Sequence, residues 1–335
     1  MKPTTVAIAA IILVLSIIAL SVYNKKPLEI KYSRILMGTV VEITIIGDDE
    51  TGLNAAAETA FAEIKRLEGL MSHYKEDSDV GRINAAAGKE AAHVSIETFE
   101  VIEAALEVSR LSSGAFDVTM GALGKAWHFT KDDKGAMSPP SKEEVKTILQ
   151  LVDYRQIILD KKHSAVKLAK EGMKINLGGV AKGYIVGRAA AVLKKNGVKK
   201  GIIHAGGDMV VFNETDASPR LIGIQDPRNK DKMIGTLKIS NAAIASSGDY
   251  ERFFIKDGKR YHHIMDPSTG FPADKSMAVT IAAKNPTFAD ALSTAVFVMG
   301  HIDGMKLIEE LPDVEGLIIS ADGKLTVSSG LKVNL

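Results

Sequence analysis

The amino-terminal segment Val6–Val22 limits what this chain can be more than any other part of the sequence. It is an apolar run of 17 residues that only Ser16 and Ser21 interrupt. A membrane-spanning helix needs roughly 17–25 such residues, whereas the apolar core of a cleaved signal peptide has about 7–15. The length therefore favours an uncleaved membrane anchor in residues 1–27, with a cleaved signal as the alternative, and leaves residues 28–335 as the folded body.

The charges on either side of the run give its orientation only weakly, because Lys2 precedes it while Lys25 and Lys26 follow it. We expect the body to lie on the extracytoplasmic face of the inner (cytoplasmic) membrane, anchored by residues 6–22. If the segment is cleaved, we expect a periplasmic protein.

The rest of the chain has the composition of a globular domain. The sequence is 46% hydrophobic and 25% charged, and all 29 glycines follow the apolar run. Three of the 42 basic residues and none of the 41 acidic ones lie in residues 1–27, so the body has a net charge of −2. This charge argues against a nucleic-acid partner, because phosphate binding needs a concentrated basic face. The absence of Cys excludes disulfides, thiolate metal sites, cysteine nucleophiles and lipid attachment to a cysteine.

Hydrophobic periodicity predicts an α+β fold with an antiparallel sheet, because short strands are joined by tight turns and helices form separate blocks. No linker divides the body, so we expect one domain. The expected helices are Leu53–Ser72, Glu97–Leu111, Ser141–Leu149, Ala181–Lys195 and Thr287–Met299. The expected strands are Gly38–Ile46, Ile157–Leu159, Ala165–Leu168, Lys174–Leu177, Gly201–His204, Met209–Phe212, Leu221–Ile224, Ile234–Ile239, Ala243–Ala245, Phe253–Ile255, Tyr261–Ile264, Met277–Ala283, Leu317–Ile319 and Lys324–Val327.

A glycine-rich segment, Gly178–Gly183, lies between an expected strand and an expected helix. Glycines let backbone amides approach a ligand closely, and a helix N-terminus favours an anion. Lys182 would add a point charge for a phosphate. The string is neither a Walker loop nor a dinucleotide-binding fingerprint, so those nucleotide folds are not supported. A tight turn with an exposed lysine is the alternative.

Asp290 and Thr294 lie four residues apart and therefore on one face of an expected helix. A carboxylate and a hydroxyl are hard oxygen ligands that suit Mg²⁺. The alternative is an aspartate that complements the helix dipole beside an ordinary threonine.

The string from Tyr261 to Gly270 brings two histidines and an aspartate to a strand end. Strand alternation sends His262 and His263 to opposite faces, so only one of them can face a given site. His263 and Asp266 could supply a proton acceptor and its orienting partner. The alternative is a turn in which Asp266 binds backbone amides.

Eight short strings of this sequence are similar, in their order, to those of one family. They are Met37-Gly38-Thr39, Ser78-Asp79-Val80, Gly114-Ala115-Phe116-Asp117, LGGVAKGY from Leu177 to Tyr184, Gly206-Gly207-Asp208, Ser247-Gly248-Asp249-Tyr250, HIMDPSTG from His263 to Gly270, and Ala289-Asp290-Ala291-Leu292-Ser293-Thr294. From about residue 33 to 330 the chain resembles the ApbE family, which consists of FAD:protein FMN transferases.

The resemblance implies a T-fold-like α+β architecture with FAD held in a cleft between sheet and helices. It implies an enzyme that uses Mg²⁺ to cleave the FAD pyrophosphate, transfers FMN to a Thr or Ser hydroxyl of a target protein and releases AMP. The expected acceptors are flavoprotein subunits of ion-pumping complexes and flavinylated reductase domains. Unlike the lipoproteins among its relatives, this chain has no Cys and could be tethered only through Val6–Val22.

The resemblance also implies roles for particular residues. The metal ligands correspond to the Ala181 carbonyl and the side chains of Asp290 and Thr294. Lys182 would hold phosphate oxygens, and His263 would accept the proton of the incoming hydroxyl, with Asp266 orienting it or replacing it. The expected flavin and adenine contacts are Met37, Tyr74, Ala115, Phe116, Asp117, Gly178, Lys182, Tyr184 and Ile264. An FAD pyrophosphatase and a non-catalytic, membrane-tethered flavin-binding protein are the alternatives.

Overall fold

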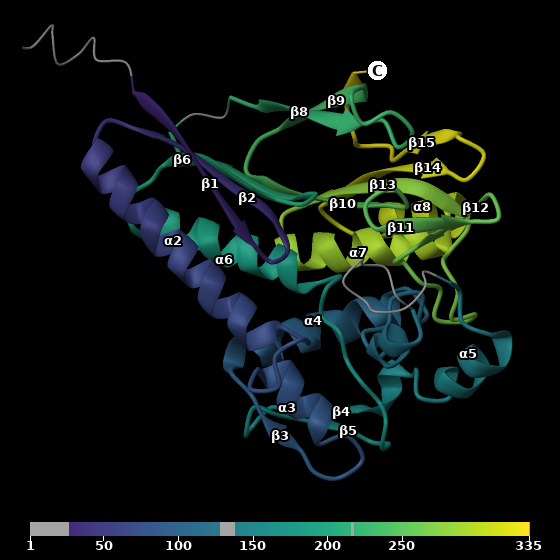
Figure 1. Cartoon of the computed structure of the whole chain (residues 1–335). Helices are drawn as coiled ribbons and strands as arrows, with labels where there is room; N and C mark the ends of the chain where they lie inside the picture. The colour runs from purple at the N-terminus through teal and green to yellow at the C-terminus, as the bar shows by residue number, and fades with distance from the viewer. Residues whose placement is uncertain (1–26, 128–137, 216–217, 335) are drawn as a thin grey trace, which may run out of the picture.

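An eight-stranded sheet in which every neighbouring pair of strands is antiparallel forms the centre of the molecule (Figure 1). Its strands, in spatial order, are β1 (Leu28–Leu36), β2 (Thr39–Gly47), β6 (Lys200–Ala205), β7 (Asp208–Asn213), β10 (Ala242–Gly248), β13 (Ser276–Ala283), β14 (Val314–Ser320) and β15 (Leu325–Val327). The expected α+β class with a largely antiparallel sheet is therefore confirmed.

The computed structural model describes residues 27–127, 138–215 and 218–334. The Val6–Val22 run, with its expected anchor, lies outside the described residues. Among the helices of the described ranges, none combines the length and the apolar character needed to cross a membrane.

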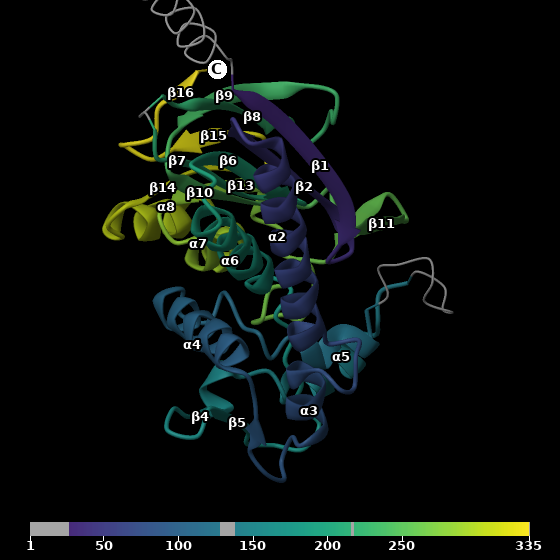
Figure 2. The same ribbon diagram turned by 90° about the vertical axis from the view of Figure 1, so that its left-hand side faces the viewer.

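Four helices cover one face of this sheet, as Figures 1 and 2 show. They are α2 (Glu50–Met71), α6 (Ala181–Lys195), α7 (Pro286–Met299) and α8 (His301–Glu310). The helix α7 lies across β10 and β13 and also contacts α6. Most of its residues are buried, because its sequence is apolar around almost the whole circumference. It is therefore the central helix of the layer.

A second, three-stranded sheet packs over part of the opposite face. Its strands are β8 (Arg220–Gln225), β9 (Met233–Ile239) and β16 (Val333–Asn334). Val211, Leu237 and Leu317 belong to the apolar cluster between the two sheets, separate from the larger cluster under the helices. Covering on both faces explains why β13 is buried along nearly its whole length.

The remaining elements lie beyond the helical layer, at the end of the molecule away from β8 and β9 (Figure 1). They are α3 (Asp79–Ala85), β3 (Ala92–His93), α4 (Ile96–Leu111), η1 (Gly121–Lys125), α5 (Lys142–Leu149), η2 (Tyr154–Gln156), β4 (Ile157–Asp160) and β5 (Ala165–Leu168). A hairpin of β11 (Phe253–Lys256) and β12 (Lys259–His262) completes the fold. Its turn at Asp257 and Gly258 has two left-handed residues and confirms the expected turn.

The strand expected at Lys174–Leu177 is wrong. Only Lys174 forms a bridge, to Met120. The Asn84 side chain instead forms two hydrogen bonds with the backbone of Ile175. Nδ2 of Asn84 donates to the Ile175 carbonyl at 3.0 Å, and Oδ1 of Asn84 accepts from the Ile175 amide at 2.7 Å. A side chain of α3 therefore takes the place of a neighbouring strand.

Candidate functional site

The start of α6 lies directly against α7, and a glycine makes this approach possible. A Cβ added to Gly183 would be 2.1 Å from the Pro286 carbonyl oxygen and 2.7 Å from the Cβ of Asp290. Any larger residue would therefore force the helices apart. The glycine-rich segment thus ends on a helix N-terminus that faces the side chains of α7.

Asp290 reaches from α7 to this helix N-terminus. Its carboxylate is 3% exposed, and Oδ2 accepts a hydrogen bond of 2.8 Å from the Gly183 amide. Burial raises the pKa of Asp290, although the Lys182 charge and the amides of Lys182 and Gly183 act in the opposite direction. The helix N-terminus favours the anion, but the protein alone does not fully compensate its desolvation.

Lys182 lies between two buried carboxylates. Its ammonium forms an ion pair with Asp208, and it lies 3.9 Å from Oδ1 of Asp290. Burial alone would lower the pKa of Lys182, but the charges of Asp208 and Asp290 outweigh it and raise the pKa. Burial, followed by the charge of Asp290, raises the pKa of Asp208 to about 7. The lysine therefore remains charged.

The position of Asp208 depends on the tight turn between β6 and β7. Gly206 and Gly207 have φ values of 54° and 101°, which favour glycine. They bring Asp208, the first residue of β7, into register with Ala205. Asp208 occurs in the Gly-Gly-Asp string of the sequence, but its ion pair with Lys182 is visible only in the fold.

Thr294 also faces the glycine-rich segment. A Cβ on Gly179 would lie 3.3 Å from Oγ1 of Thr294 and 3.2 Å from the ring of Phe116. On the other side, Oγ of Ser247 lies 3.4 Å from Oγ1 of Thr294. Asp290 and Thr294 thus share α7, as their spacing predicts, and Phe116 approaches them.

The residues present at this site fit a hard divalent cation. When both are ionised, the buried carboxylates of Asp208 and Asp290 carry two negative charges against the single positive charge of Lys182, and a bound cation would offset the difference. Thr294 adds a neutral oxygen beside them. Mg²⁺ prefers oxygen ligands and usually keeps waters. In the described ranges, no group of three or more His, Asp or Glu side chains could by itself hold a metal.

His262 and His263 face opposite ways, as strand alternation predicts. His262 is buried, and its Nε2 lies 2.8 Å from the Ala273 carbonyl. The Nδ1 atom of the His263 ring lies 3.3 Å from the Arg252 carbonyl. A carbonyl can only accept, so Nδ1 of His263 carries the hydrogen and Nε2 is left as a proton acceptor. Surrounding protein atoms, and then the charge of Arg252, lower the pKa of His263 to about 4.

The structure does not pair His263 with Asp266, and this corrects the expected orienting role. The Asp266 carboxylate accepts from the amide of Ser268 at 2.8 Å and from its hydroxyl at 2.6 Å. It therefore closes the turn after β12, as the alternative interpretation has it. The carbonyl of Arg252 is the group that orients His263.

Two of the expected flavin contacts, Met37 and Tyr74, lie in turns after β1 and after α2. Met37, at the tip of the β1–β2 hairpin, has a left-handed φ of 54°, and its amide donates to Glu68 at 2.9 Å. Tyr74 is 79% exposed and packs on His73, with the ring centroids 3.9 Å apart. An exposed aromatic ring and a strained hairpin tip are typical of a ligand-binding surface.

Two other expected flavin contacts, Asp117 and Tyr184, form hydrogen bonds with residues of the protein itself. Buried Asp117 accepts from Thr119 and from the Tyr154 amide, and burial raises its pKa. The Tyr184 hydroxyl donates to Glu100 at 2.7 Å. These side chains therefore stabilise the fold around the site.

Three more of the expected contacts are Ile264, Gly178 and Ala115, which lie in three different settings. Ile264 is buried in the core. The Gly178 amide donates to its neighbour Asn176 at 2.9 Å, at the exposed start of the glycine-rich segment. Ala115 lines a cavity at the ends of α4 and α7.

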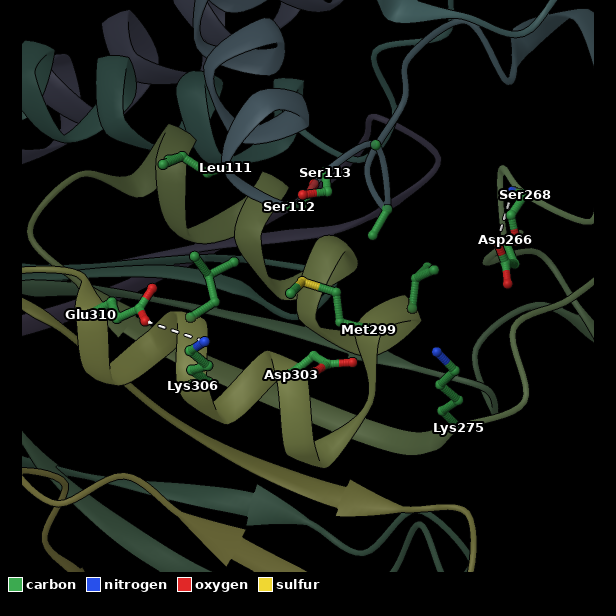
Figure 3. Close-up of a pocket in the computed structure, with 14 residues that line it drawn as sticks. Leu111, Ser112, Ser113, Asp266, Ser268, Lys275, Met299, Asp303, Lys306 and Glu310 are labelled. Carbon is green, nitrogen blue, oxygen red and sulfur yellow. Dashed lines mark hydrogen bonds and ion pairs between the residues drawn. The ribbon is translucent and has the colours of Figure 1, made fainter.

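Two cavities of the described structure are lined by residues other than those of the charged cluster. One, of about 490 Å³, is bounded by the ends of α4 and α7 and by α8, and Figure 3 shows Asp303, Lys275 and Met299 around it. The other, of about 730 Å³, lies between α5, the β11–β12 hairpin and β13. Asp266 lines both, whereas Lys182 and Asp290 line neither.

Comparison with known proteins gives one consistent result. Residues 37–318 match the ApbE family. An FAD:protein FMN transferase of Klebsiella pneumoniae is 32% identical over 300 residues, covering 89% of this chain and 91% of that protein. One from Treponema pallidum is 32% identical over 320 residues, covering 90% and 88%.

Solved structures agree with the sequence relatives. The ApbE protein of Thermotoga maritima has a TM-score of 0.83 at 36% identity, covering 90% of this chain and 97% of that one. The flavin transferase ApbE from Vibrio cholerae has a TM-score of 0.78 at 28% identity, covering 90% and 98%. Both relatives thus share the fold over nearly the whole of their own length.

Proposed function

This chain belongs to the ApbE family, and from that membership we propose that it is an FAD:protein FMN transferase. The enzyme moves the FMN half of FAD to a Thr or Ser hydroxyl of an acceptor protein and releases AMP. The hydroxyl oxygen forms a new bond to the FMN phosphorus, and the bond from that phosphorus to the AMP oxygen breaks. The observation that carries this proposal is the Asp208–Lys182–Asp290 cluster at the N-terminus of α6.

The cluster has the features needed to hold a diphosphate. Lys182 remains charged and, with the amides of the glycine-rich segment, binds phosphate oxygens. Asp208 holds the lysine in place from β7, so the ammonium does not need to be ordered when the substrate arrives. Asp290, Thr294 and the Ala181 carbonyl would hold Mg²⁺, which supplies positive charge to offset that of the diphosphate and the leaving group.

His263 is the group we assign as general base. Its lowered pKa keeps the imidazole neutral at pH 7, and the Arg252 carbonyl fixes the tautomer in which Nε2 accepts. The proton of the acceptor hydroxyl passes to Nε2 as the oxygen bonds to phosphorus. Asp266 accepts from Ser268 rather than contacting His263, so we do not assign it the role of orienting the base.

The test is incubation of the full chain with FAD, Mg²⁺ and candidate flavoprotein acceptors, followed by mass spectrometry. Covalent FMN on an acceptor Thr or Ser, with one AMP released per flavin, is the expected result. Free FMN and AMP without an acceptor would instead support an FAD pyrophosphatase. FAD binding without AMP release would support a flavin-binding protein without catalytic activity.

We also propose that residues 6–22 hold the enzyme on the extracytoplasmic face of the inner membrane, where its acceptor would be a membrane-associated flavoprotein subunit. The support is the length and apolar character of the run. Amino-terminal sequencing of the membrane-associated protein tests it. A mature chain that begins after Val22 would show a cleaved signal instead.

A further inference from the structure

Arg252 lies in the segment that joins β10 to β11, where other parts of the chain converge on it. Its guanidinium lies against the tip of the β1–β2 hairpin, since a Cβ on Gly38 would be 3.5 Å from Nη2. His73, after α2, and His263, after β12, are both near enough for the Arg252 charge to contribute, after burial, to their lowered pKa values. The charge of Lys182 also interacts with that of Arg252.

Among the ion pairs of the ranges that the structure describes, none involves the exposed Arg252 side chain. Arg228 and Arg260, on neighbouring segments, behave differently, because both bind Asp249, at 2.6 and 3.4 Å. Arg252 is thus a cation that lies between the tip of the β1–β2 hairpin and His263, and it has no carboxylate of its own in the described ranges. Such an arrangement attracts an anion.

We propose that Arg252 binds the diphosphate of FAD together with Lys182 and is therefore a substrate-binding residue of the active site. This inference rests on the proposed function. A guanidinium presents parallel N–H donors that match phosphate oxygens, whereas an ammonium acts as a point charge. The flavin and adenine rings are uncharged, so the diphosphate is the part of FAD that an unpaired cation recognises.

The backbone carbonyl of Arg252 also contributes to the site, because it contacts His263. The Arg252 carbonyl accepts from the His263 amide at 3.1 Å and lies 3.3 Å from its Nδ1. The group that orients the base and the group that binds the phosphate therefore belong to one residue. Only the side chain is removed by substitution, so the two roles are separable by experiment.

The test compares the binding of FAD and of riboflavin, which has no phosphate, to the full chain. Arg252→Gln should raise the dissociation constant of FAD by about 10–100-fold, as expected for the loss of a hydrogen bond to a charged group. The constant for riboflavin should change by less than about twofold, because no phosphate contact is lost. Arg252→Lys, which keeps the charge but loses the planar fork, should give an intermediate FAD constant.

The matched control is Arg155→Gln, at an exposed arginine bound to Asp153. It should leave both constants unchanged, and thermal denaturation should show all three variants folded. An unchanged FAD constant in Arg252→Gln overturns the inference, and so does equal weakening of FAD and riboflavin. If one of these two results is found while wild-type protein cleaves FAD normally, the proposed role of Arg252 is rejected but the proposed function is not. If wild-type protein binds no FAD, the proposed function fails as well.

Discussion

Two buried aspartates, Asp79 in α3 and Asp290 in α7, differ sharply in what the protein offers their carboxylates. Asp79 is 1% exposed and is bound by the Arg82 guanidinium, the amide and hydroxyl of Ser95, and the Thr98 hydroxyl. The last three bonds measure 3.0, 2.5 and 2.7 Å. Neighbouring donors within the protein thus bind this carboxylate, and their hydrogen bonds connect α3 to the start of α4.

Asp290 is equally enclosed but has fewer donors of its own. It accepts from the Gly183 amide at 2.8 Å, and the Lys182 ammonium at 3.9 Å is shared with another carboxylate. A buried charge with incomplete compensation reduces stability. The difference teaches that Asp79 is placed for the fold, whereas Asp290 is placed for a ligand that supplies the missing charge.

The largest effect should come from Asp290→Asn. The amide oxygen can still accept from Gly183, so the fold should persist, and the melting temperature should stay constant or rise because a poorly compensated charge is removed. FMN transfer should fall about a thousandfold, the size of loss seen when one electrostatic element leaves an active site. AMP release and thermal denaturation measure both. Full activity, or a large drop in melting temperature, would contradict the comparison.

The reverse outcome is expected for Asp79→Ala. Removing the carboxylate leaves the donors of Ser95 and Thr98 without an acceptor. It should therefore lower the free energy of unfolding by about 3 kcal/mol. Activity per folded molecule should be unchanged. Urea denaturation measures the loss, and Asp77→Ala, at the exposed aspartate two residues earlier, is the control. A selective loss of activity in the Asp79 variant would reject its structural role.

The close approach of α6 and α7 offers a sharper test. Gly183→Ala should lower the free energy of unfolding by about 2–3 kcal/mol, because the new methyl overlaps the Pro286 carbonyl, and should also reduce AMP release. Gly69→Ala is the matched control in α2, where nothing lies within 4 Å of the new Cβ. It should raise stability by roughly 0.5–1 kcal/mol through its better helix propensity. Equal effects in calorimetry would refute the packing argument.

The smallest expected effect is that of pH on the part of kcat/KM that depends on His263. In this respect His263 should differ from the buried carboxylates, whose pKa values are raised. A free histidine loses its proton near pH 6.5, but the lowered pKa of His263, about 4, keeps it neutral well below that. The contribution of His263 to kcat/KM should therefore change by less than about twofold between pH 6 and 8. A pH profile beside a His263 NMR titration measures this. A histidine signal that titrates near 6.5 would show that the ring is not shielded.

Local patterns predicted the elements better than the site. The spacing of Asp290 and Thr294 places both on one face of a helix, and α7 confirms the helix. Strand alternation likewise separates His262 from His263 correctly. Both predictions depend only on backbone geometry over a few residues.

Contacts between distant segments were beyond such patterns. Nothing near Lys174–Leu177 shows that Asn84 will bind this backbone in place of a strand. Asp208 meets Lys182 only because the sheet brings β7 beside α6. That no carboxylate of the described ranges pairs with Arg252 is visible only once each of those carboxylates has a position. The strand β1, by contrast, was missed although its sequence alternates, because charged residues interrupt it at the sheet edge.

The order of strands in the large sheet determines when the site can form during synthesis and folding of the chain. β2 pairs with β6, so Val41 meets Ala205 only after the intervening helices have been synthesised. Asp290 follows still later and lies in the helix on which the site is built. Contacts of such long sequence separation form slowly and late. A partly synthesised chain therefore lacks the site, and flavin chemistry begins only when folding is finished.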